Sequence, residues 1–129
     1  MINVVAAVIK DENGKILITQ RNLKKAHGGL WEFPGGKIET NETRENAIIR
    51  EIKEELDVDI EVESYLSEKV FNYPEKDINL IVLECKKING EIRLLEHEDY
   101  KWVSKNELDN FKFAPADLFI IEKIRYREE

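Results

Sequence analysis

Three carboxylates in one short segment are the residues of this chain that are best suited to chemistry. Glu51, Glu54 and Glu55 lie within the segment REIKEE, residues 50–55. On a helix, side chains three and four positions apart are neighbours, and like charges there cost about 0.2–0.5 kcal/mol per pair. Carboxylate oxygens are ligands that Mg²⁺ prefers, so a bound cation would offset this repulsion. In a chain with 27 acidic residues, a solvated acidic face is the alternative interpretation.

The helix that would carry these carboxylates is predicted for residues 44–56, with Thr43 as its N-cap. Its apolar positions have the spacing of one buried face. They are Ala47, Ile48, Ile49, Ile52 and Leu56. The three glutamates then fall on a flank beside this stripe, and Arg50, one turn before Glu54, can bridge to it. Ahead of the helix, Gly35-Gly36 is expected to end the extended run 30–33.

Most of the remaining segments predict strands. Residues 1–10 lack a basic leader and a small-residue cleavage site, so they predict a buried strand rather than a signal peptide. The Asn13-Gly14 turn predicts a hairpin that joins this strand to residues 15–20. Further strands are predicted at residues 61–73, 77–88 and 100–103.

The C-terminal part is predicted to be helical. Ser104 and Glu107 have the capping-box spacing and should open a short helix. A last amphipathic helix, residues 115–127, carries Leu118, Ile120, Ile121 and Ile124. The order β-β-α-β-β-α-α predicts an α/β (α+β) fold in which a mixed sheet is sandwiched between helices, α/β/α. A chain of 129 residues is expected to form a single domain, residues 1–129.

Composition narrows the classes of partner. The formal charge is −7, from 20 basic and 27 acidic residues, and no basic run is long enough to follow a phosphate backbone, so duplex nucleic acid is not expected as a partner. No run of eighteen apolar residues predicts a membrane span. The single cysteine, Cys85, lies in an apolar run and predicts a buried strand thiol, and the lack of a disulfide framework suits the cytoplasm.

The spacing around the acidic segment resembles a known signature. Five residues separate Gly36 from Glu42, and seven separate Glu42 from Arg50. Together with REIKEE, this pattern resembles the signature of the Nudix hydrolases, a loop and helix that bind divalent metal in pyrophosphohydrolases. One position departs, because the family expects Gly where Asp57 stands, at a helix end that commonly adopts left-handed backbone. The departure affects the local turn and removes no metal ligand.

The resemblance implies a Nudix fold with a Mg²⁺ site, for which Mn²⁺ would be a substitute. The implied ligands are the Gly35 carbonyl and the carboxylates of Glu51, Glu54, Glu55 and Glu96. Glu96 is singled out because it lies six residues before a tryptophan, as in the family; a solvated loop acid is its alternative interpretation. The general base is either Glu51 or Glu96, and we favour Glu51. Arg50 is expected to hold the glutamates, so the implied catalytic residues are Glu51, Glu54 and Arg50.

Three further segments resemble the MutT branch of this family: residues 13–21, 30–39 and 113–117. The resemblance implies that Arg21 contacts phosphate, Phe33 lines a base pocket and Asp117 reads the base. The alternatives are a surface charge for Arg21, a core position for Phe33 and the N-cap of the last helix for Asp117. An ionised Asp117 only accepts hydrogen bonds and suits the amino group of cytosine, whereas a protonated one also serves an oxidised purine.

The branch includes 8-oxo-dGTP diphosphatases and CTP pyrophosphohydrolases. The resemblance therefore implies an enzyme that converts a (deoxy)nucleoside triphosphate and water into a monophosphate and pyrophosphate, and so cleanses the nucleotide pool of oxidised or modified nucleotides. Two alternatives stay open: hydrolysis of another diphosphate derivative, such as ADP-ribose or a dinucleoside polyphosphate, and a non-catalytic nucleotide-binding module. The expected partner is a small nucleotide, and the expected state is a monomer or homodimer.

Overall fold

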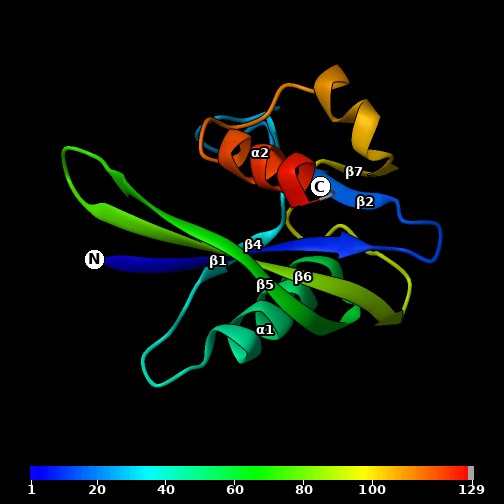
Figure 1. Ribbon diagram of the computed structural model, residues 1–129, viewed down its shortest axis with the longest axis horizontal. Coiled ribbons are helices and arrows are strands. Elements are labelled where there is room, and N and C mark those ends of the chain that lie inside the picture. The colour runs from blue at the N-terminus through cyan, green and yellow to red at the C-terminus, as the bar shows by residue number, and fades with distance from the viewer. Residues whose placement is uncertain (128–129) are drawn as a thin grey trace.

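The computed structural model describes residues 1–127 and shows a mixed sheet between helices, as the sequence predicts (Figure 1). Its strands are β1 (Ile2–Lys10), β2 (Ile16–Gln20), β3 (Trp31–Glu32), β4 (Gly35–Lys37), β5 (Asp59–Asn72), β6 (Asp77–Asn89) and β7 (Asp99–Val103). Its helices are α1 (Arg44–Leu56), the 3₁₀ helix η1 (Lys105–Asn110) and α2 (Asp117–Arg127). The described part of the chain contains no helix long and apolar enough to cross a membrane.

The first strand organises the sheet. β1 runs parallel to β6 over its whole length and antiparallel to β2 and β4. The strand order is β3-β2-β1-β6-β5, with β4 also paired to β1 and β7 to β2. β5 and β6 form a long antiparallel hairpin, which projects beside the N-terminal end of β1 in Figure 1.

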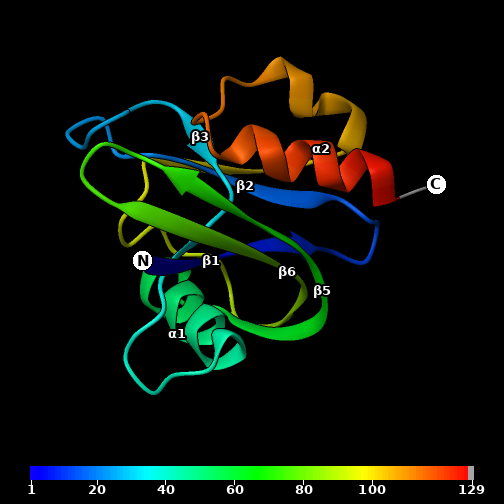
Figure 2. The ribbon, with the colours of Figure 1, turned by 60° about the vertical axis from the view of Figure 1, so that its left-hand side comes forward.

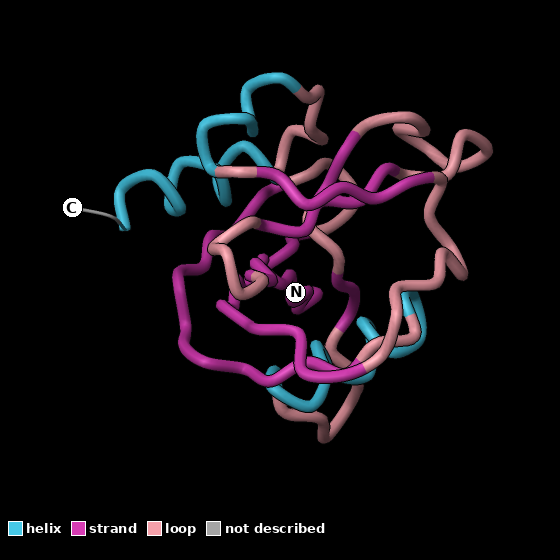
Figure 3. Tube along the Cα trace, turned by 90° about the vertical axis from the view of Figure 1, so that its right-hand side faces the viewer, coloured by secondary structure: helices cyan, strands magenta, loops and turns pink. Residues whose placement is uncertain are grey.

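Successive residues of β1 point to opposite faces of the sheet, and each face is covered by helix (Figures 2 and 3). Val5, Ala7 and Ile9 pack in the cluster that includes the buried face of α1. Ala6 and Val8 pack in the cluster that includes α2 and η1. This alternation makes the α/β/α sandwich, and residues of α1, β3 and β4 line one cleft beside the sheet.

The helix α1 has the bounds that the sequence predicts. Thr43 accepts a hydrogen bond from the Asn46 N–H, 3.0 Å, as an N-cap should. Asp57 ends the helix in left-handed backbone with φ of 57°. The predicted apolar stripe is too wide at one position, because Ile49 is 38% exposed while Ala47, Ile48, Ile52 and Leu56 are fully buried.

The C-terminal helices agree with the prediction in part. The Glu107 carboxylate accepts from the Ser104 N–H at 2.8 Å, and the helix that it opens is a 3₁₀ turn. α2 begins at Asp117 rather than near residue 115, because the Ala114–Asp117 and Pro115–Leu118 hydrogen bonds form turns before it. Ile120, Ile121 and Ile124 are buried as predicted, but Leu118 is 58% exposed.

The glycine pair before α1 was predicted to end the extended segment, and this prediction is wrong. Gly35–Lys37 forms strand β4, in which Gly35 and Gly36 pair with Ala6 and Val5 of β1. Two glycines have low intrinsic strand propensity, so the cross-strand pairing with β1, which local sequence does not reveal, decides their conformation.

Candidate active site

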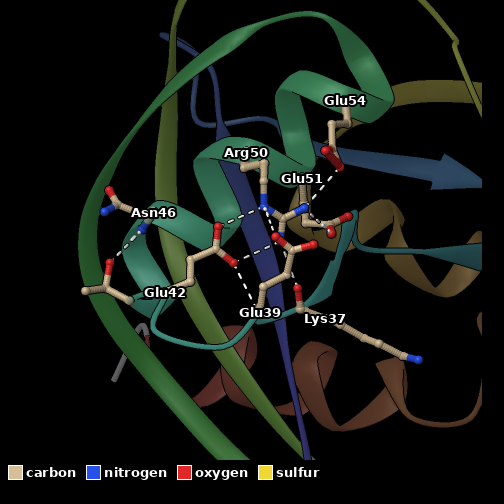
Figure 4. A network of polar contacts seen from close by, with 8 residues as sticks. Lys37, Glu39, Glu42, Asn46, Arg50, Glu51 and Glu54 are labelled. Carbon is tan, nitrogen blue, oxygen red and sulfur yellow. Dashed lines mark hydrogen bonds and ion pairs between the residues drawn. The ribbon is translucent and has the colours of Figure 1, made fainter.

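The acidic face of α1 is organised by Arg50. Its guanidinium donates to Glu42 at 2.8 and 2.9 Å, to Glu51 at 2.8 Å and to Glu54 at 3.0 Å. It also donates to the Lys37 carbonyl at 3.0 Å, which ties α1 to β4 (Figure 4). The hydrogen bonds from Arg50 lower the pKa of Glu42 to about 2, so this pair stays ionised. Arg50 therefore holds the glutamates, as the sequence predicts.

Both glycines of β4 make close contacts that an added side chain would disturb. A Cβ on Gly35 would overlap the Val5 carbonyl of β1. A Cβ on Gly36 would instead overlap the carboxylate of Glu51. The absence of side chains here lets α1 place Glu51 directly against the β4 backbone.

The third carboxylate of the segment is in a different environment. Glu55 is 7% exposed, and its Oε1 is buried without a hydrogen-bond partner. Burial and the nearby charges of Glu51, Glu32 and Glu96 raise its pKa to about 9. A buried carboxyl among carboxylates is protonated unless a cation compensates it, so this donor set fits a hard divalent ion.

The loop before β7 brings a further acid to the end of α1. The Arg93 and Leu95 N–H groups donate to the Leu56 and Glu55 carbonyls, at 2.9 and 3.1 Å. These bonds satisfy carbonyls at the helix C-terminus, which have no partner within the helix. As a result, Glu96 lines the same cleft as Glu51, Glu54 and Glu55.

In the arrangement seen here, the acidic side chains of the cleft do not form a set of ligands that could coordinate one ion together. No three acidic or histidine side chains within residues 1–127 are grouped as ligands of one ion. Glu51 and Glu54 each give an oxygen to Arg50, so a cation would share or replace those bonds. The structure thus gathers the predicted ligands around one cleft, with Gly35 also on its wall.

Sequence reasoning missed two residues of this cleft, Glu32 and His97. The His97 ring is 7% exposed and its Nε2 lies 3.0 Å from Glu32 Oε2. The other Glu32 oxygen accepts from Arg21 Nη1 at 2.8 Å. Burial opposes ionisation of Glu32, but the hydrogen bonds from His97 and Arg21 outweigh it and lower its pKa. The two partners of Glu32 lie 11 and 65 residues away in the chain, so the local sequence does not predict these contacts. The one local indication is that Glu32 is a charged residue inside an apolar run.

Two cavities meet at this point. The acidic cleft has a volume of about 490 Å³ and also carries the cations Lys25 and Lys37 on its wall. A second cavity of about 270 Å³ has apolar walls from β1, β5 and β6. Four residues line both cavities: Arg21, Glu32, Gly35 and Gly36. A ligand with an apolar ring and a charged chain would fit across the junction.

The apolar cavity contains the remaining predicted site residues. Phe33 is 3% exposed and stacks on Phe113 with ring centroids 5.4 Å apart, so it belongs to the core and also lines the cavity. Arg21 forms an ion pair and lines both cavities, which is more than a surface charge would do.

Asp117 is the buried acid of the apolar cavity. Its Oδ1 accepts from the Phe33 N–H at 3.1 Å, and it is the first residue of α2. Burial raises the pKa of Asp117 to about 7, against the lowering effect of the Phe33 N–H bond. Near neutral pH its second oxygen can therefore donate or accept a hydrogen bond.

Comparisons with known proteins agree with this arrangement. The NUDIX domain family matches residues 2–123. A CTP pyrophosphohydrolase of Escherichia coli K12 is 36% identical over 122 residues, 95% of this chain and 90% of that protein. An 8-oxo-dGTP diphosphatase of the same strain is 31% identical over 124 residues, 96% of each chain. The solution structure of the E. coli ORF135 protein superposes with a TM-score of 0.87 at 35% identity, covering 98% of this chain and 89% of that one.

Proposed function

Because this chain belongs to the Nudix family, we propose that it is a Mg²⁺-dependent nucleoside triphosphate pyrophosphohydrolase that cleanses the nucleotide pool of oxidised or modified nucleotides. One observation carries the proposal: an acidic cleft meets an apolar cavity whose wall includes the buried acid Asp117. The first cavity suits a polyphosphate with its cation, and the second suits a base.

In this proposal, Glu51, Glu54, Glu55, Glu96 and the Gly35 carbonyl hold Mg²⁺. When bound, Mg²⁺ neutralises phosphate charge and orients the attacking water. Glu51, which lies against the β4 backbone, takes the proton of the water as general base. The water oxygen attacks the β-phosphorus, the bond to the α–β bridging oxygen breaks, and the monophosphate and pyrophosphate leave. Arg50 donates to Glu51 and Glu54 and so positions both carboxylates beside the cleft.

Positive groups complement the polyphosphate. The chain has a formal charge of −7, so a triphosphate needs local cations as well as the metal. Arg21 lies at the junction of the two cavities, and Lys25 and Lys37 line the acidic cleft. We assign Arg21 to the phosphate next to the nucleoside, because it also borders the base cavity.

The base is recognised by Phe33 and Asp117. The Phe33 N–H fixes one oxygen of Asp117, and the second is left for the base edge. When ionised, this oxygen accepts from the amino group of a cytosine, and when protonated it donates to an acceptor on an oxidised purine. We therefore expect cytidine-type or oxidised-guanine triphosphates to be preferred. The proposed location is the cytoplasm, where the single free thiol, buried Cys85, needs no partner.

A hydrolysis panel tests this proposal. The protein is supplied with Mg²⁺ and equal concentrations of 8-oxo-dGTP, dGTP, CTP, dCTP, 5-methyl-dCTP and ADP-ribose, and the products are separated. Monophosphate and pyrophosphate from one triphosphate above the others is the expected result, and the preferred base then identifies what Asp117 reads. Turnover of ADP-ribose without turnover of any triphosphate would contradict the proposal.

A further inference from the structure

Glu32 lies where the two cavities meet, and each of its carboxylate oxygens has its own donor. Oε1 accepts from Arg21 Nη1 at 2.8 Å, and Oε2 lies 3.0 Å from His97 Nε2. The side chain is 19% exposed. Hydrogen bonds between charged groups in such partly buried positions are short and directional. Glu32 is therefore held in one orientation from both sides.

The His97 ring is the fixed end of this chain of contacts. An ionised carboxylate only accepts hydrogen bonds, so Nε2 must carry the proton that it donates to Glu32. The ring itself is 7% exposed, and its loop is fixed at both ends, by Leu95 N–H to the Glu55 carbonyl and Glu98 N–H to the Gln20 carbonyl. His97 can thus anchor Glu32 from the wall of the acidic cleft, where its Nε2 also lies 4.0 Å from Glu55 Oε1.

Arg21 is the other end of this chain of contacts, and two hydrogen bonds hold its guanidinium. Its Nε donates to the Ala26 carbonyl at 3.0 Å and its Nη1 to Glu32. Within residues 1–127 these bonds leave Nη2 as the guanidinium nitrogen that can face a ligand, on a side chain that borders both cavities. Without Glu32, the guanidinium would keep only the carbonyl of a surface loop.

We propose that Glu32, anchored by His97, is a positioning residue that aims the Arg21 guanidinium at the polyphosphate. The inference rests on the proposed function, because it needs a phosphate ligand in the cleft. Each Glu32 oxygen contacts one positioned donor, Arg21 or His97, so we expect the loss of Glu32 to change substrate affinity rather than the chemical step. Glu32→Gln should therefore raise KM about tenfold, the loss expected for one charge-assisted hydrogen bond, and leave kcat within about twofold.

A double-mutant cycle tests the coupling. KM and kcat are measured with Mg²⁺ and the best substrate of the panel for the unmodified protein, Arg21→Ala, Glu32→Gln and the double variant. If Glu32 acts through Arg21, Glu32→Gln has no further effect once Arg21 is alanine. Independent effects that multiply, or a fall in kcat at unchanged KM, would overturn the proposal.

Binding of inorganic tripolyphosphate keeps the test independent of catalysis. The same four proteins are titrated by calorimetry in the presence of Mg²⁺. If the unmodified protein hydrolyses no triphosphate, the proposed function fails. The dissociation constants for tripolyphosphate then decide the inference alone, by whether Glu32→Gln still weakens binding once Arg21 is alanine. Coupled losses of affinity support the positioning role, and equal affinity in the unmodified protein and Glu32→Gln contradicts it.

Variants at His97 separate positioning from packing. The His97→Gln amide can donate from a place near that of Nε2, whereas His97→Leu fills the space without a donor. We expect His97→Leu to raise KM in the direction of Glu32→Gln, and His97→Gln to recover most of the lost affinity. Equal losses in both would overturn the anchoring role. The control is Asp109→Asn, which breaks a 2.6 Å ion pair with Arg125 outside both cavities and should leave KM and kcat unchanged.

Discussion

The glutamates of this cleft have the same side chain but differ in how deeply they are buried. Glu51 and Glu54 are held by Arg50, whereas Glu55 is buried, lacks a partner for one oxygen and has a pKa raised to about 9. The order REIKEE predicts three similar glutamates, but their roles differ because the third faces the sheet. A strongly perturbed carboxyl in a cleft is typical of a functional site.

Asp117 should make stability depend on pH. Its folded pKa of about 7 lies above the ordinary value of 3.8 for an aspartate, so the folded state holds the proton more tightly. Stability from this group is complete below pH 4 and is lost as pH rises through about 7, by up to about 4 kcal/mol. Asp117→Asn cannot titrate, so its unfolding free energy should lack this component. Denaturant unfolding of both proteins from pH 4 to 8 measures the difference, and parallel curves would contradict the assignment.

At the scale of elements, the turn from β4 into α1 brings the site together. The glycines of β4 permit two different close approaches, one to the backbone of β1 and one to the Glu51 side chain. The two positions should therefore respond differently to the same substitution.

Gly36→Ala should impair activity more than stability. The new Cβ meets the end of a flexible Glu51 side chain, which can move away from its place at little cost. Gly35→Ala meets the Val5 carbonyl and should cost about 1–3 kcal/mol of stability, because backbone of β1 must shift. Steady-state hydrolysis and melting of the two variants provide the comparison. Full activity of folded Gly36→Ala would show that Glu51 does not need this contact.

The end of α1 should gain stability from a glycine. Asp57 adopts φ of 57°, and its ion pairs with Lys53 and Arg93, at 3.8 and 3.7 Å, are exposed and therefore weak. Asp57→Gly should raise the unfolding free energy by about 0.5–1 kcal/mol without changing activity. Denaturant melts measure it, and a lower midpoint would mean that the ion pairs outweigh the backbone strain.

These elements also show what local sequence can predict. The bounds of α1 follow from its N-cap and apolar spacing, and the long strands β5 and β6 were predicted to within two residues at each end. β4 was missed because its pairing to β1 decides it. Glu32 and His97 were missed because their contact joins residues 65 positions apart. Local sequence patterns predict individual helices and strands. The residues that line a cleft depend instead on which of these helices and strands the sheet brings together.

For the molecule as a whole, the acidic cleft should link cation binding to folding. Native protein gathers Glu51, Glu54, Glu55 and Glu96 on one wall, and unfolded chain does not. Mg²⁺ at about 100 times its dissociation constant should therefore stabilise the protein by about 2.7 kcal/mol. Melting with and without Mg²⁺, at ionic strength matched with NaCl, measures this shift. An equal shift in Glu54→Gln would argue against Glu54 as a ligand.

Two variants of α1 test whether the glutamates of this helix form a catalytic metal site. Glu54→Gln removes a proposed ligand, and Glu45→Gln makes the same change at an exposed position that pairs with Arg44 and does not line the cleft. With Mg²⁺ and the best triphosphate, Glu54→Gln should lose at least about 100-fold in pyrophosphate release, while Glu45→Gln keeps it. Unchanged release from folded Glu54→Gln would show that Glu54 does not hold a catalytic metal.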